Sequence, residues 1–131
     1  MNLLLDTQAL IWWRQGNRKL GPRARAAIET GAATVRVSAA TAWEIAIKWR
    51  SGRLTLPSPP HLWWPAAFES SAFEVLVLTP EHALAVAGLP DHHADPFDRV
   101  LVAQAQLEGL TIVTSDAAFD EYDVPVLDAR A

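Results

Sequence analysis

The segment Leu3-Leu4-Leu5-Asp6-Thr7 decides the fold of this chain. Its apolar part, with Asn2, is short and uninterrupted, which indicates a strand buried on both faces. The aspartate that follows places a carboxylate where the strand ends. Carboxylates resist burial unless they are paired or bind a metal ion. The segment therefore predicts a buried strand, residues 2–5, with an acidic group at its carboxyl end.

Short apolar segments alternate with helical ones along the rest of the sequence. Further strands are expected at residues 34–37, 74–78 and 110–114 and, more weakly, at 124–127. Helices are expected at residues 7–14, 22–30, 39–51, 61–70, 80–88 and 96–108, with Gly31, Gly52 and Gly109 as stop signals. Alternation of this kind predicts an α/β fold in which a parallel sheet of four to five short strands is covered by helices on both faces.

The composition is that of one globular domain, expected to span residues 1–131. Half of the residues are hydrophobic and 20% are charged, which excludes a disordered chain. Cysteine is absent, so disulfides, zinc–thiolate sites and thiol catalysis are excluded. The sequence lacks signal-peptide features at its N-terminus, and no apolar run approaches the ~18 residues of a membrane span. We expect a soluble, cytoplasmic protein without a membrane partner.

The charge is distributed unevenly along the chain. Residues 1–53 hold nine of the eleven Lys and Arg and three of the fifteen Asp and Glu, a balance of +6. Residues 54–131 hold two basic and twelve acidic residues, a balance of −10. Either the basic residues form a face that attracts a polyanion, or they only solvate two short helices.

Four acids interrupt or follow the apolar segments: Asp6, Glu44, Asp98 and Asp116. Asp6 and Asp116 directly follow expected strands. Asp98 lies in the first turn of an expected helix, and Glu44 lies little more than one turn into another. Ligands of a parallel sheet bind beyond the carboxyl ends of its strands, where the crossover helices begin. All four acids are therefore expected at one edge of the sheet.

Each acid also has a purely structural explanation. Asp6 suits a helix cap, Asp98 favours the dipole of its helix, and Asp116 suits a turn. Glu44 is spaced to pair with Lys48 one helical turn later. No single acid is decisive, and the argument for a site rests on their joint placement at one edge.

A cluster of carboxylates cannot stay fully ionised without a counter-cation. Mg²⁺, or Mn²⁺ as the alternative, prefers such oxygen ligands and can activate a water for phosphodiester hydrolysis. Four residues near these acids each have two possible roles. Thr114 and Ser115 either hold a carboxylate or phosphate or are ordinary strand-end polar residues. Asp95 is either a helix cap, which we favour, or an extra ligand, and Arg99 contacts either a phosphate or an acid.

Four segments resemble the PIN-domain ribonucleases, and within them the VapC-type toxins of bacterial type II toxin–antitoxin pairs. The resemblance runs essentially from end to end. The most specific of these segments is His93-Ala94-Asp95-Pro96-Phe97-Asp98-Arg99-Val100-Leu101-Val102-Ala103-Gln104-Ala105. The others are Leu3-Leu4-Leu5-Asp6-Thr7, Val37-Ser38-Ala39-Ala40-Thr41-Ala42-Trp43-Glu44-Ile45 and Thr114-Ser115-Asp116.

Two positions depart from the family's pattern. Related sequences often have His at the position of Gln8 and a basic residue at the position of Ala94. Neither departure affects an acid of the expected site, although contacts to RNA could differ.

The resemblance implies a PIN-like three-layer α/β/α sandwich and Mg²⁺-dependent endoribonuclease activity. By this resemblance Asp6, Glu44, Asp98 and Asp116 are the metal-binding and catalytic acids. It further implies a homodimer and inhibition by a small antitoxin protein. His92 and His93 are expected to be loop residues, with His93 contacting a phosphate as the alternative.

Two adjacent tryptophan pairs, Trp12-Trp13 and Trp63-Trp64, bear on the partner. Adjacent residues of a helix point in different directions, so one member of each pair could be exposed. Either all four pack in the core, or the pairs border an apolar groove that accepts an antitoxin segment or a second subunit. The resemblance favours the groove.

Overall fold

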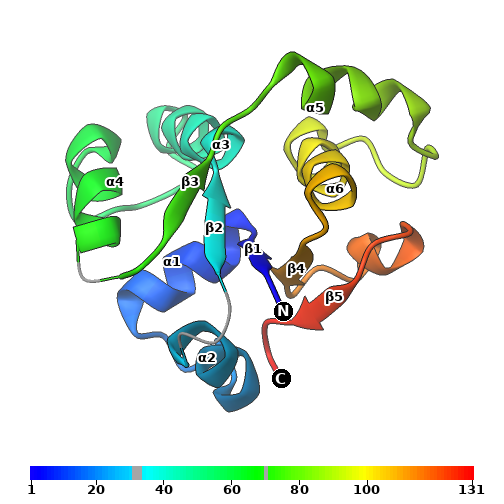
Figure 1. Ribbon diagram of the computed structural model, residues 1–131. Helices are drawn as coiled ribbons and strands as arrows, with labels where there is room; N and C mark the ends of the chain where they lie inside the picture. The colour runs from blue at the N-terminus through cyan, green and yellow to red at the C-terminus, as the bar shows by residue number, and fades with distance from the viewer. Residues whose placement is uncertain (31–33, 70) are drawn as a thin grey trace.

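The computed structural model describes residues 1–30, 34–69 and 71–131, and its strands form one parallel sheet in the order β3-β2-β1-β4-β5 (Figure 1). The expected helix ends at Gly31 and Ser70 lie outside the described residues. The strands are β1 (Leu3–Leu5), β2 (Val35–Ser38), β3 (Glu74–Leu76), β4 (Thr111–Thr114) and β5 (Val126–Asp128). The triple-leucine strand is central, as its complete burial requires.

Helices cover both faces of the sheet, and Figure 1 shows α1 and α2 on the side opposite α5 and α6. The helices are α1 (Thr7–Gln15), α2 (Pro22–Glu29), α3 (Ala39–Arg50), α4 (Pro60–Glu69), α5 (Pro80–Ala85) and α6 (Pro96–Glu108), with 3₁₀ turns η1 (Val86–Gly88) and η2 (Ala117–Glu121). The expected three-layer α/β/α arrangement is confirmed.

Two apolar cores result from the alternation of side chains along the strands. On one face, Leu3 and Leu5 pack with residues of α1, α2 and α4, including Leu10 and Trp63. On the other face, Leu4 packs with residues of α6, β4 and the following segment. Burial on both faces explains why β1 contains no polar residue.

The strand register aligns the carboxyl ends of the three central strands. Leu5 pairs with Val37 of β2 and with Val113 of β4. The next residue of each strand segment is polar: Asp6, Ser38 or Thr114. The sheet therefore presents a row of polar groups at one edge, where α1 and α3 begin.

Every strand differs from its expected bounds by at least one residue, and β3 and β5 differ by two residues at one end for identifiable reasons. β3 ends at Leu76 rather than at residue 78, because its neighbour β2 ends at Ser38, the partner of Leu76. β5 begins at Val126 rather than at residue 124. Pro125 has no N–H to donate, and only its carbonyl joins the ladder, accepting from the Ile112 N–H at 2.9 Å.

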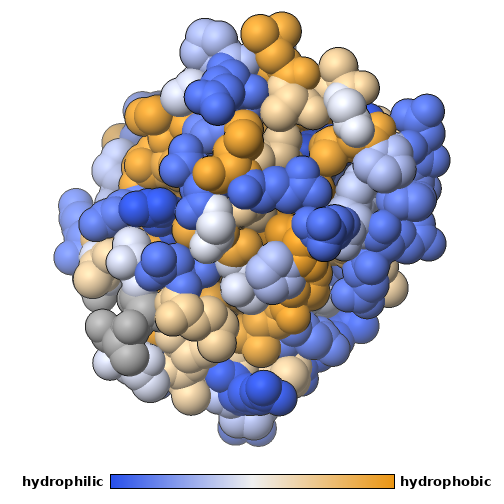
Figure 2. All heavy atoms as spheres, turned by 45° about the vertical axis from the view of Figure 1, so that its right-hand side comes forward, coloured by the Kyte–Doolittle hydropathy of each residue, from blue (hydrophilic) through white to orange (hydrophobic). Residues whose placement is uncertain are grey.

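Several apolar side chains remain at the surface of the described structure. The most exposed are Leu84 of α5 at 75%, Met1 at 71%, Val77 at 64% and Trp43 of α3 at 61%. On the face shown in Figure 2, apolar groups lie between hydrophilic ones, with a hydrophilic margin at the right of the view. The longest helix of the described ranges, α6, has 13 residues, and none of these helices combines the length and apolar character of a membrane span.

Candidate active site

A cavity of about 340 Å³ opens beyond the carboxyl ends of the central strands. All four acids of the expected site line it: Asp6, Glu44, Asp98 and Asp116. Thr7, Gln8, Ile11, Lys48, Arg53, Leu54, Asp95 and Ser115 complete the lining. The tertiary structure thus brings together residues from four separate parts of the chain.

Asp6 is both a helix cap and a cavity residue. Its Oδ1 accepts a hydrogen bond from the Ala9 N–H at 2.8 Å, which caps α1. Its Oδ2 accepts from the Thr114 hydroxyl at 2.5 Å. The Thr114 oxygen in turn accepts from the Asp116 N–H at 3.0 Å. Thr114 therefore links the Asp6 carboxylate to the backbone of Asp116.

Glu44 pairs with Lys48, as its spacing suggested, but it is not a surface residue. Its side chain is only 5% exposed. Oε2 accepts from the Lys48 ammonium group and Oε1 from the Thr7 hydroxyl, each at 2.5 Å. The lysine compensates the charge of a carboxylate that burial would otherwise destabilise.

The first turn of α6 holds Asp95 and Asp98. The expected capping role of Asp95 is confirmed, because its Oδ1 accepts from the N–H groups of Phe97 at 2.9 Å and Asp98 at 3.1 Å. Asp95 also lines the cavity. Asp116 caps η2 in a similar way, accepting from the Ala118 N–H at 2.9 Å.

Burial and the repulsion between carboxylates raise the pKa values of two acids of the cavity. The pKa of Asp98 is raised to about 8, mainly by burial. The charges of Asp95, Asp6, Glu44 and Asp116 contribute to the same shift. Burial also raises the pKa of Asp6 to about 6, against the lowering effect of the hydrogen bonds that it accepts. A site that disfavours its own negative charge is suited to a cation.

In the described ranges, no three acidic or imidazole groups are already arranged as a metal-ligand set. The contacts give the reason, because Asp6 is turned toward Thr114, Glu44 toward Lys48 and Asp98 toward His93. The donor chemistry nevertheless fits Mg²⁺ or Mn²⁺, since several carboxylates share one cavity and two of them, Asp6 and Asp98, have raised pKa values.

Arg99 was expected to contact either a phosphate or an acid, and the structure shows a contact with an acid. Arg99 does not line the cavity. Its guanidinium donates to the carbonyl groups of Pro90 at 2.7 Å and Val86 at 3.2 Å, and to the Tyr122 hydroxyl at 3.3 Å. Its acidic neighbour is the fully exposed Asp91, 3.9 Å away. Five donors on one planar group suit this role of holding a loop.

His93 was not assigned to the site from the sequence. Its Nε2 lies 3.3 Å from Asp98 Oδ2, and its Nδ1 lies 2.8 Å from the Tyr122 hydroxyl. Side chains five residues apart do not meet in a regular helix or on one face of a strand. The conformation of the loop brings His93 to Asp98, so no sequence pattern predicted this contact.

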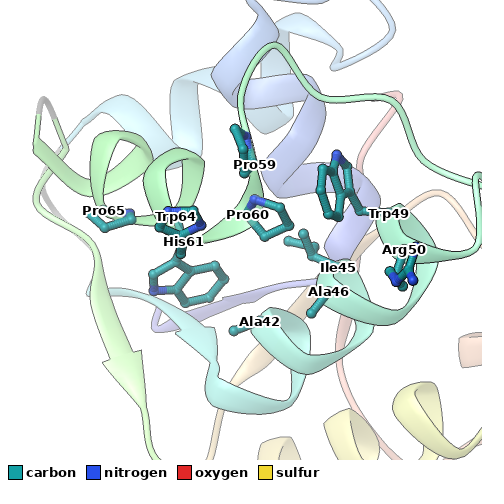
Figure 3. Close-up of a pocket in the computed structure, with 10 residues that line it drawn as sticks. All are labelled: Ala42, Ile45, Ala46, Trp49, Arg50, Pro59, Pro60, His61, Trp64 and Pro65. Carbon is teal, nitrogen blue, oxygen red and sulfur yellow. The ribbon is translucent and has the colours of Figure 1, made fainter.

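A second cavity, of about 790 Å³, lies between α3 and α4 and is almost entirely apolar (Figure 3). Residues that line it include Ala42, Ile45, Ala46, Trp49, Pro60 and Trp64. The two tryptophan pairs differ. Trp12 and Trp63 are 5% and 4% exposed, and Trp64 borders the cavity, whereas Trp13 lies away from the cavity and packs partly buried against the core.

Comparisons with known proteins agree with this architecture. Among solved structures, VapBC2 from Rickettsia felis, bound to a promoter DNA fragment, matches with a TM-score of 0.72 at 12% identity, over 97% of this chain and 98% of the other. VapBC from Salmonella typhimurium, bound to DNA, matches with a TM-score of 0.68 at 19% identity, over 98% of both chains. FitAcB from Neisseria gonorrhoeae matches with a TM-score of 0.67 at 20% identity, over 97% of both chains.

These likenesses concern the fold. No curated protein matches the sequence. The family model described as PIN domain matches residues 3–125, which include all four acids of the cavity. The chain therefore belongs to the PIN-domain family.

Proposed function

We propose that this protein is a metal-dependent endoribonuclease and the VapC-type toxin of a toxin–antitoxin pair. The observation that carries the proposal is the meeting of Asp6, Glu44, Asp98 and Asp116 in one cavity of a PIN-family chain. The reaction is hydrolysis of RNA phosphodiester bonds by an activated water. The likeness to VapBC structures from Rickettsia felis and Salmonella typhimurium supports the toxin assignment.

The cofactor in this proposal is Mg²⁺, with Mn²⁺ as a substitute, held by the four acids. Such an ion would activate a water and stabilise charge on a phosphoryl oxygen. The chain's own contribution is to hold the acids in place. Thr114 orients Asp6, and Thr7 orients Glu44, each through a hydroxyl that donates to the carboxylate.

The basic groups of the cavity support an RNA substrate. Lys48 and Arg53 line the cavity beside the acids and can bind the phosphates on either side of the scissile bond. Ser115 lies at the same wall and offers a hydroxyl donor. The other basic residues of the N-terminal half do not line this cavity. For them, the alternative that they solvate helices remains.

The apolar cavity supports an antitoxin as the partner. Helix α3 contributes Ile45 and Trp49 to this cavity and Glu44 and Lys48 to the acidic one. An apolar antitoxin segment seated between α3 and α4 would therefore lie against the helix that carries part of the proposed active site. A homodimer is also part of the proposal, and the exposed Val77 and Leu84 supply apolar surface for it.

Cleavage of RNA by purified variants tests the enzymatic proposal. Asp98→Asn and Asp6→Asn should each abolish Mg²⁺-dependent cleavage, a loss on the order of 100-fold or more, because each removes a charged oxygen from the cavity. Asp123→Asn is the matched control, since Asp123 is exposed and lies outside the cavity. Circular dichroism establishes that the variants are folded. Undiminished cleavage by folded Asp98→Asn protein would refute the proposal.

Growth of a bacterial host tests the toxin assignment. Induction of the wild-type protein without a partner should arrest growth, and induction of Asp98→Asn should not. Growth that continues despite accumulation of folded, RNA-cleaving protein would exclude a toxin role while leaving the nuclease activity intact. Mapping RNA ends after a brief induction would then identify the target.

A further inference from the structure

Three side chains outside the acidic cavity form a hydrogen-bonded chain that ends on Asp98. The guanidinium of Arg99 lies 3.3 Å from the Tyr122 hydroxyl. The hydroxyl lies 2.8 Å from His93 Nδ1, and His93 Nε2 lies 3.3 Å from Asp98 Oδ2. The chain thus connects the loop before α6, the segment after η2 and an acid of the cavity.

The direction of the hydrogen bonds follows from the donors and acceptors. Arg99 can only donate, so the Tyr122 oxygen accepts from it. The hydroxyl hydrogen then needs an acceptor, and among the contacts of the described residues this is His93 Nδ1. A neutral imidazole whose Nδ1 accepts carries its hydrogen on Nε2. That hydrogen faces the Asp98 carboxylate.

We propose that Arg99 and Tyr122 fix His93 as its Nε2–H tautomer, and that His93 is a positioning residue that holds the Asp98 carboxylate in the cavity. The tautomer assignment stands on the contacts alone. Its consequence for catalysis rests on the proposed nuclease function.

The far end of the chain is anchored to the backbone. Arg99 also donates to the carbonyl groups of Val86, Leu89 and Pro90. Tyr122 is only 4% exposed and the His93 side chain 19%. A buried hydroxyl between two fixed groups has little freedom to reverse its hydrogen bonds.

Asp98 needs such support more than its neighbours do. Asp6 and Glu44 each accept hydrogen bonds from a threonine hydroxyl, whereas the contact found for the Asp98 carboxylate is His93. A donor at Nε2 restrains the rotation of the carboxylate and keeps its oxygen available, as outer hydrogen-bond partners do for metal-binding groups.

Long-range ¹H–¹⁵N NMR of the metal-free protein tests the tautomer. At alkaline pH, where the imidazoles are neutral, His93 should show the Nε2–H pattern, and its signals are assigned by their loss in His93→Gln. Tyr122→Phe removes only the hydroxyl and should give a mixture of tautomers. An Nδ1–H pattern in the wild-type protein, or an unchanged pattern in Tyr122→Phe, would overturn the proposal.

Two substitutions of His93 test the positioning role. The Gln amide nitrogen can replace Nε2–H, whereas the Asn amide nitrogen replaces Nδ1. His93→Asn should lose roughly 10–100-fold in RNA cleavage or Mn²⁺ affinity, and His93→Gln should retain clearly more of both. Equal losses in the two variants would contradict a positioning role.

The matched control is His92→Gln. His92 contacts the Tyr122 ring and lies 3.6 Å from Glu121, but it makes no contact with Asp98. Its cleavage and Mn²⁺ affinity should match the wild type. If Asp98→Asn itself leaves cleavage unchanged, the nuclease proposal fails, while the NMR result on the tautomer remains valid.

Discussion

At the scale of single residues, helix capping and site formation are compatible because a carboxylate has two oxygens. Asp6 caps α1 through Oδ1 and meets Thr114 through Oδ2. Asp95 and Asp116 also cap through Oδ1 alone. Each cap uses one oxygen of the carboxylate, and all three residues line the cavity. A structural role for these acids is therefore part of how the site is organised.

The raised pKa values predict how the stability of the metal-free protein depends on pH. Asp98 and Asp6 have pKa values of about 8 and about 6 in the fold, against an ordinary value of 3.8. The folded state binds their protons more tightly than the unfolded chain does. Their contribution to stability is therefore full below about pH 4 and is lost as the pH rises to about 8.

Urea unfolding across this range measures the effect. The free energy of unfolding should fall between about pH 5 and about pH 8, and Asp98→Asn should remove most of the fall above about pH 6. Asp123→Asn, an exposed acid outside the cavity, should reproduce the wild-type curve. A free energy of unfolding that rises over this range would contradict the raised pKa values of Asp6 and Asp98.

At the scale of elements, α2 begins against the residues that follow β5. The backbone oxygen of Ala131 accepts from the N–H groups of Arg23 at 3.0 Å and Ala24 at 3.1 Å. The Gly21 N–H donates to the Ala129 oxygen at 2.8 Å. These contacts satisfy N–H groups that the first turn of a helix leaves without an internal partner. Gly21, the N-cap residue of α2, has no side chain with which to accept a capping hydrogen bond.

Gly21→Ala should therefore destabilise the protein. A Cβ atom at this position would lie 2.1 Å from the Ala131 oxygen and 2.4 Å from the Arg130 oxygen, so the backbone must shift. We expect a loss of about 1–3 kcal/mol in the free energy of unfolding. Gly88→Ala is the matched control, because no heavy atom lies within 4 Å of a Cβ there. Equal stabilities of the two variants in urea would contradict the close contact.

At the scale of the whole molecule, α3 separates the two cavities. The helix places Glu44 and Lys48, one turn apart, on the acidic cavity, and its other face meets α4 across the apolar cavity. A partner bound in the apolar cavity would contact α3, the helix that carries Glu44. Under the proposed function, an antitoxin bound in the apolar cavity would act on α3 without occupying the acidic cavity.

Ala46→Glu should separate partner binding from catalysis. Ala46 is exposed and lines the apolar cavity, so a charged side chain there would have to be desolvated when an apolar segment binds. The variant should cleave RNA like the wild type but resist rescue by a co-expressed antitoxin. Ala26→Glu, at an exposed position of α2 away from the cavity, should still be rescued. Full rescue of Ala46→Glu would place the antitoxin elsewhere.

The sequence by itself determined the parallel sheet, most element bounds to within one or two residues, and the edge at which the acids lie. Apolar runs such as Leu3–Leu5 must be buried on both faces, and parallel strands must end at one edge, so local pattern is sufficient for these features. The pairing of Glu44 with Lys48 also follows from helical spacing.

Only the tertiary structure decided the polar contacts that have no regular spacing along the chain. Arg99 belongs by sequence to the most specific motif, yet it binds loop carbonyl groups, while His93 takes the place beside Asp98. The loop from Leu89 to His93 has no periodic pattern, so its path depends on packing against Tyr122, far along the chain. Hydrogen-bond partners across such distances depend on side-chain geometry to within about an ångström, which residue spacing does not specify.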